Sequence, residues 1–130
     1  MSIVCIDTNI LIWGIKKQAT EGQENKIDQA ERFLKHLDSK GNDIIVPSLV
    51  VAELLMNIPN EQKGILLNKI SKSFRIVAFD TISATLYSTI WFDLNRDNKE
   101  LINKSQLKNE MKIDCMIIAI AKTNNAECDK

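Results

Sequence analysis

Three acidic residues in this chain stand beside apolar runs, where a carboxylate is hard to accommodate. Asp7 follows the apolar residues 3–6, and Glu53 lies between two apolar triplets. Asp114 follows Ile113 and precedes another apolar run. An ionised carboxylate that is half buried without a partner loses its hydration at a cost of several kcal/mol. A divalent cation shared among the three side chains would remove that cost, so the sequence predicts a metal site.

Oxygen ligands determine the chemistry that such a site supports. Mg²⁺ and Mn²⁺ prefer carboxylates and water in octahedral geometry, and Mg²⁺ also binds substrate phosphates. A bound cation lowers the pKa of its water and stabilises the charge that builds on an attacked phosphorus, which favours phosphodiester hydrolysis. Zinc is disfavoured because His36, the only histidine, falls in the middle of a predicted helix, away from the acids.

Each acid also has a purely structural interpretation. Asp7 and Asp114 stand where an aspartate caps the N-terminus of a helix, and for Asp114 taken alone the cap is the better interpretation. Glu53 would then carry an ordinary charge on the open face of its helix. The predicted positions of all three acids at one edge of a sheet favour a shared metal site over three separate structural roles.

Short apolar runs alternate with helical patterns along the chain. Strands are predicted at residues 3–6, 43–47 and 75–79. One predicted helix contains Glu53, and the other main ones cover residues 24–38, 61–72, 81 to about 95, and 113–121. This alternation is typical of βαβ units, so we expect an α/β domain in which helices flank a parallel sheet.

The predicted elements bring the acids to one edge of the sheet. Ligands of parallel sheets bind at the carboxyl ends of the strands. Asp7 ends the first strand, and Glu53 lies in the first turns of the helix after the second strand, with Ser48 as its predicted N-cap. Asp114 is predicted to open the last helix, and the loop before it must bring it to the same edge. Asp80 also follows a strand, but a plain helix cap explains it.

Composition limits the classes of protein and partner. The chain of 130 residues fits one domain, 1–130. Lysine plus arginine and aspartate plus glutamate both number 17, so no global basic field is present to hold a nucleic acid. Lys104, Lys108 and Lys112 recur every four residues before Asp114, and a helix there would present a basic stripe to phosphates beside the site. An ordinary solvated helix face is the simpler interpretation of that stripe.

Membrane and secretory signals are weak in this sequence. No segment approaches the roughly 18 consecutive apolar residues of a membrane span, and the N-terminus lacks the basic segment of a signal peptide. We therefore expect a cytoplasmic protein. The three cysteines form no C-x-x-C pair, and Cys5 and Cys115 lie among apolar residues, which favours buried thiols over disulfides.

Three motifs together resemble the PIN-domain ribonucleases, a family that includes the toxin subunits of bacterial toxin–antitoxin pairs. The first is Ile-Asp-Thr-Asn-Ile-Leu-Ile at residues 6–12, and the second is the Pro-Ser turn at 47–48 that leads to Val-Ala-Glu-Leu at 51–54. The third is Ile-Asp at 113–114, followed by apolar residues at 117–119 and 121. Each motif alone is weak, but their order and spacing are fairly specific, and the resemblance runs from residue 3 to about 125.

This resemblance implies a Mg²⁺- or Mn²⁺-dependent endoribonuclease with a Rossmann-like, three-layer fold. It makes Asp7, Glu53 and Asp114 the catalytic, metal-binding acids. Asn9 supports Asp7 on this interpretation, and Thr8 and Ser48 are further supporting residues. The implied partners are an RNA substrate, an antitoxin protein that inhibits the enzyme, and a second copy of the chain, because homodimers are usual in the family.

The C-terminal end departs from the family pattern. PIN domains normally continue into a final strand and a Thr-x-Asp/Asn turn, which brings a further acid or polar group to the metal. No apolar strand follows residue 123, so we expect the last strand to be missing, by truncation or by a shorter sheet. Asp129 falls where the loop before that strand should be, and we do not assign it to the site.

Other classes of protein remain as alternatives. A site without the last polar group would bind metal weakly or turn over slowly, which suits a catalytically weak PIN-like module that binds RNA or protein for regulation. A receiver-like signalling domain needs an adjacent acid pair after the first strand and a lysine that ends a late strand. A phosphatase of the haloacid dehalogenase type needs an aspartate at the position of Asn9, so both of these fit less well.

Overall fold

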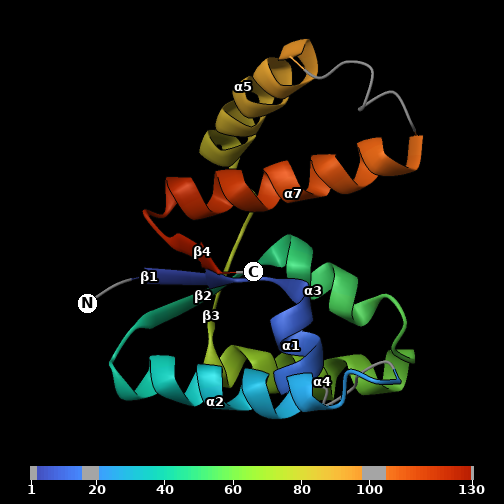
Figure 1. Cartoon of the computed structure of the whole chain (residues 1–130), viewed down its shortest axis with the longest axis vertical. Coiled ribbons are helices and arrows are strands. Elements are labelled where there is room, and N and C mark those ends of the chain that lie inside the picture. The colour runs from blue at the N-terminus through green and yellow to red at the C-terminus, as the bar shows by residue number, and fades with distance from the viewer. Residues whose placement is uncertain (1–2, 16–20, 98–104, 130) are drawn as a thin grey trace.

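A four-stranded parallel sheet forms the centre of the computed structural model, which describes residues 3–15, 21–97 and 105–129 (Figure 1). The strands are β1 (Ile3–Ile6), β2 (Asp43–Pro47), β3 (Arg75–Val77) and β4 (Glu127–Asp129). Their order across the sheet is β3–β2–β1–β4. The three predicted strands and the α/β class are therefore confirmed, although β3 ends two residues earlier than predicted.

The presence of β4 shows that our expectation of a missing last strand is wrong. β4 lies parallel to β1 and pairs with it so that Asp129 is opposite Ile6. Its three residues carry an acid at each end, and it lies at the edge of the described sheet, where a strand needs no long apolar run. The register places Asp129 at the carboxyl end of β4, beside the end of β1 from which Asp7 follows.

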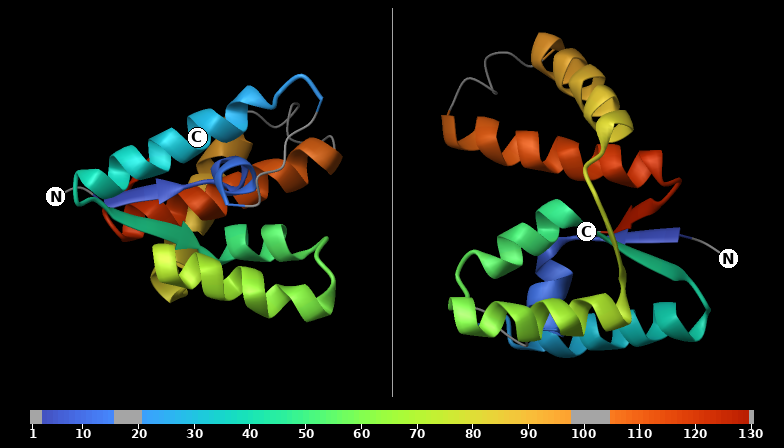
Figure 2. Two further views of the ribbon diagram at one scale, coloured as in Figure 1. Left: turned by 90° about the horizontal axis from the view of Figure 1, so that it is seen from below. Right: turned by 180° about the vertical axis from the view of Figure 1, so that it is seen from behind.

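Helices cover both faces of the sheet. They are α1 (Thr8–Gly14), α2 (Asn25–Ser39), α3 (Ser48–Leu55), α4 (Asn60–Ser73), α5 (Thr81–Asp97) and α7 (Ser105–Thr123). α7 crosses one face, while α1, α2 and α4 lie on the other, and α5 packs on the outer side of α7 (Figures 1 and 2). This is the expected three-layer arrangement. Among the described residues, no helix is both long and apolar enough to cross a membrane.

The hydrophobic core joins the sheet to the helices that carry the acids. Ile6 and Ile45 in the central strands are fully buried, as is Leu11 of α1. From α7, Ile120 is fully buried and belongs to the same cluster. The C-terminal half of α7 is thus anchored on the sheet. On the other side of the carboxyl edge, α1 and α3 are held by their contacts with the strands β1 and β2 that precede them.

Two predicted helix starts are corrected by the structure. α7 begins at Ser105, so Asp114 lies in the middle of the helix and is not its N-cap. The segment before Asp114 is mostly polar, but Leu107 and Met111 lie four residues apart, and its lysine, glutamine and glutamate residues have good helix propensity. α3 begins at Ser48 itself, its N-cap is Pro47, and no side-chain hydrogen bond caps it, so the predicted cap at Ser48 is wrong.

Candidate functional site

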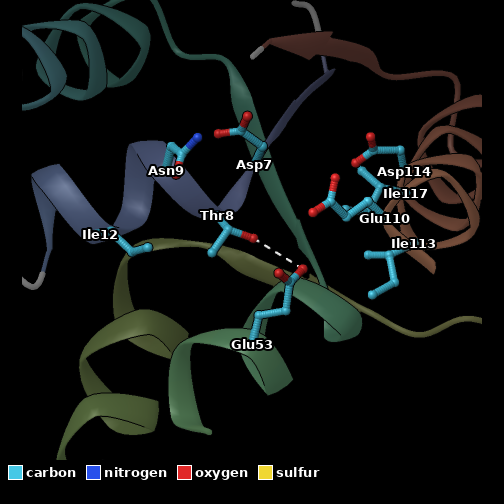
Figure 3. A pocket seen from close by; sticks show the side chains of 9 residues that line it. All are labelled: Asp7, Thr8, Asn9, Ile12, Glu53, Glu110, Ile113, Asp114 and Ile117. Carbon is cyan, nitrogen blue, oxygen red and sulfur yellow. Dashed lines mark hydrogen bonds between the residues drawn. The ribbon is translucent and has the colours of Figure 1, made fainter. Parts of the chain in front are cut away.

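An acidic pocket lies at the carboxyl edge of the sheet. It encloses about 340 Å³ and collects residues from β1–α1, α3 and α7 (Figure 3). Its lining residues are Asp7, Thr8, Asn9, Ile12, Glu53, Glu110, Ile113, Asp114 and Ile117. All three acids that the sequence singled out are therefore in one pocket. No lysine, arginine or histidine is among these described lining residues, so four carboxylates face the pocket without a neutralising side chain.

Asp7 has a structural role and a place in the pocket at the same time. It directly follows β1, and its Oδ1 accepts a hydrogen bond of 3.2 Å from the backbone N–H of Ile10. This bond caps α1, and the helix dipole adds to it because negative charge is favoured at a helix N-terminus. The capping interpretation is confirmed for Asp7, but it fixes the carboxylate at the pocket instead of excluding it from there.

Glu53 is hydrogen-bonded to Thr8, a residue of the motif at positions 6–12. It lies in the second turn of α3, half buried, and its Oε1 accepts a hydrogen bond of 3.3 Å from the Thr8 hydroxyl (Figure 3). Thr8 is the first residue of α1, so this bond joins α1 to α3 across the edge of the sheet. Thr8 therefore orients a pocket carboxylate, whereas a role for Asn9 in supporting Asp7 stays a prediction, although Asn9 does line the pocket.

α7 contributes two acids, one of which the sequence interpretation missed. Glu110 precedes Asp114 by four residues, so the two side chains lie on one face of the helix, and both project into the pocket (Figure 3). Like charges at this spacing destabilise a helix. The signal for Glu110 was this spacing, but it is visible only once residues 105–123 are known to form one continuous helix.

The donor set suits a hard divalent cation, although the side chains are not gathered into a ready cage. Carboxylate oxygens are the ligands that Mg²⁺ and Mn²⁺ prefer, and the site offers four carboxylates with no competing cationic side chain among its described lining. Within the described part of the chain, however, no three acid, histidine or cysteine side chains are close enough to surround one ion. Ligand water, which Mg²⁺ normally retains, fits such a wider arrangement.

Of the three lysines in the predicted basic stripe, the structure describes the side chain of Lys112, and this side chain does not lie beside the acids. The Lys112 ammonium lies 5.7 Å from the ring centroid of Trp91 on α5, a cation–π contact on the side of α7 that faces away from the pocket. Lys112 does not line the pocket. The side chain of Lys108 and the whole of Lys104 lie outside the described residues, so their contacts with RNA stay predictions.

Charged groups elsewhere have structural roles. The Ser83 backbone N–H donates a 2.8 Å hydrogen bond to Oδ1 of Asp80, which lowers the pKa of that carboxyl and confirms it as the cap of α5. Arg75 pairs with Asp43 at the amino ends of β3 and β2, and the hydrogen bonds raise the pKa of the guanidinium. Neither group lines the acidic pocket, and the exposed His36 does not line it either.

The parallel sheet, its two helical layers and the acid-lined pocket at its carboxyl edge together define a PIN-like α/β domain. The sequence matches the profile of the PIN domain family over residues 4–128, and the chain therefore belongs to that family. PIN domains are generally nucleases that depend on divalent metal ions.

A solved structure extends this likeness to the whole fold. The VapBC2 structure from Rickettsia felis, bound to a DNA fragment from their promoter, contains a chain that superposes with a TM-score of 0.68 at 25% sequence identity. The match covers 97% of this chain and 85% of that one. No curated protein matches the sequence significantly.

Proposed function

We propose that this protein is a Mg²⁺- or Mn²⁺-dependent endoribonuclease. The observation that carries the proposal is the gathering of Asp7, Glu53, Glu110 and Asp114 in one pocket at the carboxyl edge, with no basic side chain among its described lining. Four carboxylates repel one another and also repel a phosphate. Both effects disappear when a divalent cation binds between them, which makes the pocket suited to a phosphodiester only in the presence of metal.

Each side chain has a task in this proposal. A bound cation would hold a phosphate oxygen and make its own water more acidic. Thr8 fixes the direction of the Glu53 carboxylate, and the N-terminus of α1 fixes that of Asp7. Asp114 and Glu110 supply negative charge from the opposite side of the pocket, on α7. Carboxylate oxygens that do not bind the cation would accept a proton from the attacking water and would orient that water toward the phosphorus.

The proposed partners follow from the family and from the solved relative. RNA is the proposed substrate. The structural neighbour is a toxin–antitoxin complex, which supports an antitoxin protein as the inhibitor of this chain. A homodimer is part of the same proposal, because it is usual among PIN-domain ribonucleases.

An RNA cleavage assay tests the proposal directly. Labelled single-stranded RNA is incubated with the protein and Mn²⁺, Mg²⁺ or EDTA, and the products are separated on a gel. We expect cleavage only with metal, and a loss of at least about a hundredfold in Asp114→Asn because a charged ligand disappears. Glu21→Gln, which removes an exposed carboxylate outside the pocket, is the matched control and should cut at the rate of the unmodified protein. Absence of cleavage, or equal cleavage by Asp114→Asn, contradicts the proposal.

A second candidate is a catalytically weak PIN-like module that binds RNA or protein for regulation. Its first support, a missing last strand, is gone because β4 is present. The wide spacing of the acids in the described residues now favours it. It predicts that the protein retards RNA in a gel shift without cutting it in any metal, which is the outcome that separates the two candidates.

A further inference from the structure

One wall of the acidic pocket contains an exposed isoleucine. Ile113 is 37% exposed, and α7 projects it into the pocket next to Glu110 and Asp114 (Figure 3). Ile117, one turn further along the same face, also lines the pocket but is only 7% exposed and belongs to the core. The pocket face of α7 thus alternates carboxylates with apolar side chains, and Ile113 is the apolar side chain that a ligand can reach.

An isoleucine in this position does nothing for a cation. It offers no ligand atom, and its exposed part gains no burial energy while the pocket holds only water. A ligand that binds here would therefore present an apolar surface close to the anionic group that a cation held by the acids would bind. A nucleotide has this combination, because its nucleobase is a flat, weakly polar body within one sugar of an anionic phosphate.

The size of the pocket also favours a single nucleotide as the occupant. A volume of about 340 Å³ is near the lower end for ligand pockets, and it has to contain the phosphate side as well. One nucleotide fits that description, whereas an amphipathic helix of a partner protein needs an apolar groove several turns long. The four acids that line the pocket also disfavour an acidic peptide.

We propose that Ile113 forms the contact for the nucleobase adjacent to the phosphodiester that is cut, with Ile117 as the floor beneath it. This inference rests on the proposed ribonuclease function and deepens it, since it names the part of the substrate that one wall of the pocket recognises. The contact is made to the face of the base and not to its edge. It therefore favours a stacked or splayed single strand and discriminates only weakly among the four bases.

Other exposed isoleucines provide matched controls. Ile82 on α5 is 67% exposed and Ile65 on α4 is 74% exposed, and neither lines the pocket. Substitution of either one by alanine removes the same atoms from a helix surface as Ile113→Ala does. Neither control should alter cleavage, because neither side chain is near the carboxylates.

Abasic substitution in the substrate tests the contact. A short RNA that the protein cuts with Mn²⁺ is resynthesised with an abasic nucleotide at each position flanking the cut, and kcat/KM is measured for every oligonucleotide. For the unmodified protein we expect one position where loss of the base lowers kcat/KM about tenfold, from the apolar contact that disappears. Ile113→Ala should be about tenfold slower on the intact RNA but show less than about a twofold effect of the abasic nucleotide at that position.

Further variants keep the test decisive. Ile113→Phe offers a larger face for stacking, so it should retain or increase the abasic effect, while Ile82→Ala and Ile65→Ala should leave every ratio unchanged. If Ile113→Ala slows all oligonucleotides by the same factor, Ile113 is merely structural and the inference is overturned. If the unmodified protein cuts RNA and no abasic position matters, the base subsite alone is wrong. If it cuts no RNA with any metal, the proposed function fails first.

Discussion

Metal binding should invert the effect of one substitution on stability. Asp114→Asn removes a charge from the middle of α7, where the carboxylate makes no cap and shares a helix face with Glu110. Without metal the substitution relieves repulsion, so the variant should be slightly more stable than the unmodified protein. With metal it removes a ligand, so the order should reverse. Asp7→Asn is a less direct probe because Asp7 also caps α1, a role that asparagine can keep.

The magnitudes follow from the spacing and from linkage. Relief of a like-charge pair four residues apart on a helix is worth about 0.2–0.5 kcal/mol, or roughly 1–2 °C in Tm for a domain of this size. Mn²⁺ at about one hundred times its Kd stabilises the folded state by about 2.7 kcal/mol, or roughly 10 °C. If loss of the Asp114 carboxylate weakens binding about a hundredfold, the same Mn²⁺ concentration gives the variant only about 0.4 kcal/mol.

Thermal unfolding in EDTA and across a Mn²⁺ titration measures the sign of the Tm difference between Asp114→Asn and the unmodified protein, without metal and with it. It is followed by circular dichroism for the unmodified protein, Asp114→Asn and the control Glu21→Gln, whose metal shift should equal that of the unmodified protein. The titration is repeated with calcium and with magnesium. An Asp114→Asn variant that is stabilised by Mn²⁺ as much as the unmodified protein refutes the shared site, and so does a Tm that no divalent ion raises in any variant.

Three other substitutions test separate parts of the structure. Thr8→Val keeps the shape of the side chain but removes the hydrogen bond to Glu53, so Mn²⁺ affinity measured by calorimetry should fall several-fold, while the free energy of unfolding in EDTA falls by at most about 1 kcal/mol. Unchanged affinity would show that Thr8 does not orient the carboxylate. Asp80→Asn should lower Tm at pH 7 relative to the unmodified protein, because it keeps a capping oxygen but loses the charge. The folded pKa of Asp80 is depressed, so the stabilisation by the charged cap is present at neutral pH and is lost as pH falls through that folded pKa, and a difference between these two proteins that persists unchanged in strong acid argues against the cap charge. Arg75→Gln breaks the exposed pair with Asp43 and should cost under about 1 kcal/mol in urea unfolding while RNA cleavage stays the same, and a loss of cleavage would connect the amino edge to the site.

The site could be predicted from sequence where it coincides with apolar strands and could not where it depends on a polar helix. Asp7 and Glu53 were predictable because each follows a short apolar run, and the rule for carboxyl edges then places them together. Glu110 was not, because its helix begins in a mostly polar segment, where two apolar residues four apart and the helix propensity of the polar ones are the indications of a helix. β4 was missed for a related reason, since an edge strand of three residues with acids at both ends resembles a loop in sequence.

The division of the pocket between two parts of the fold has a consequence for metal affinity. Asp7 and Glu53 belong to a unit that the Thr8 hydrogen bond ties together at the ends of β1 and β2. Asp114 and Glu110 belong to α7, which is anchored on the sheet by its C-terminal half, around Ile120. Because no three of these acids are close enough to enclose an ion in the described structure, a cation that binds all of them directly, without intervening water, must draw the two parts together. The work of that approach would be subtracted from the intrinsic affinity, so the packing of α7 would set the metal concentration at which such a site is complete.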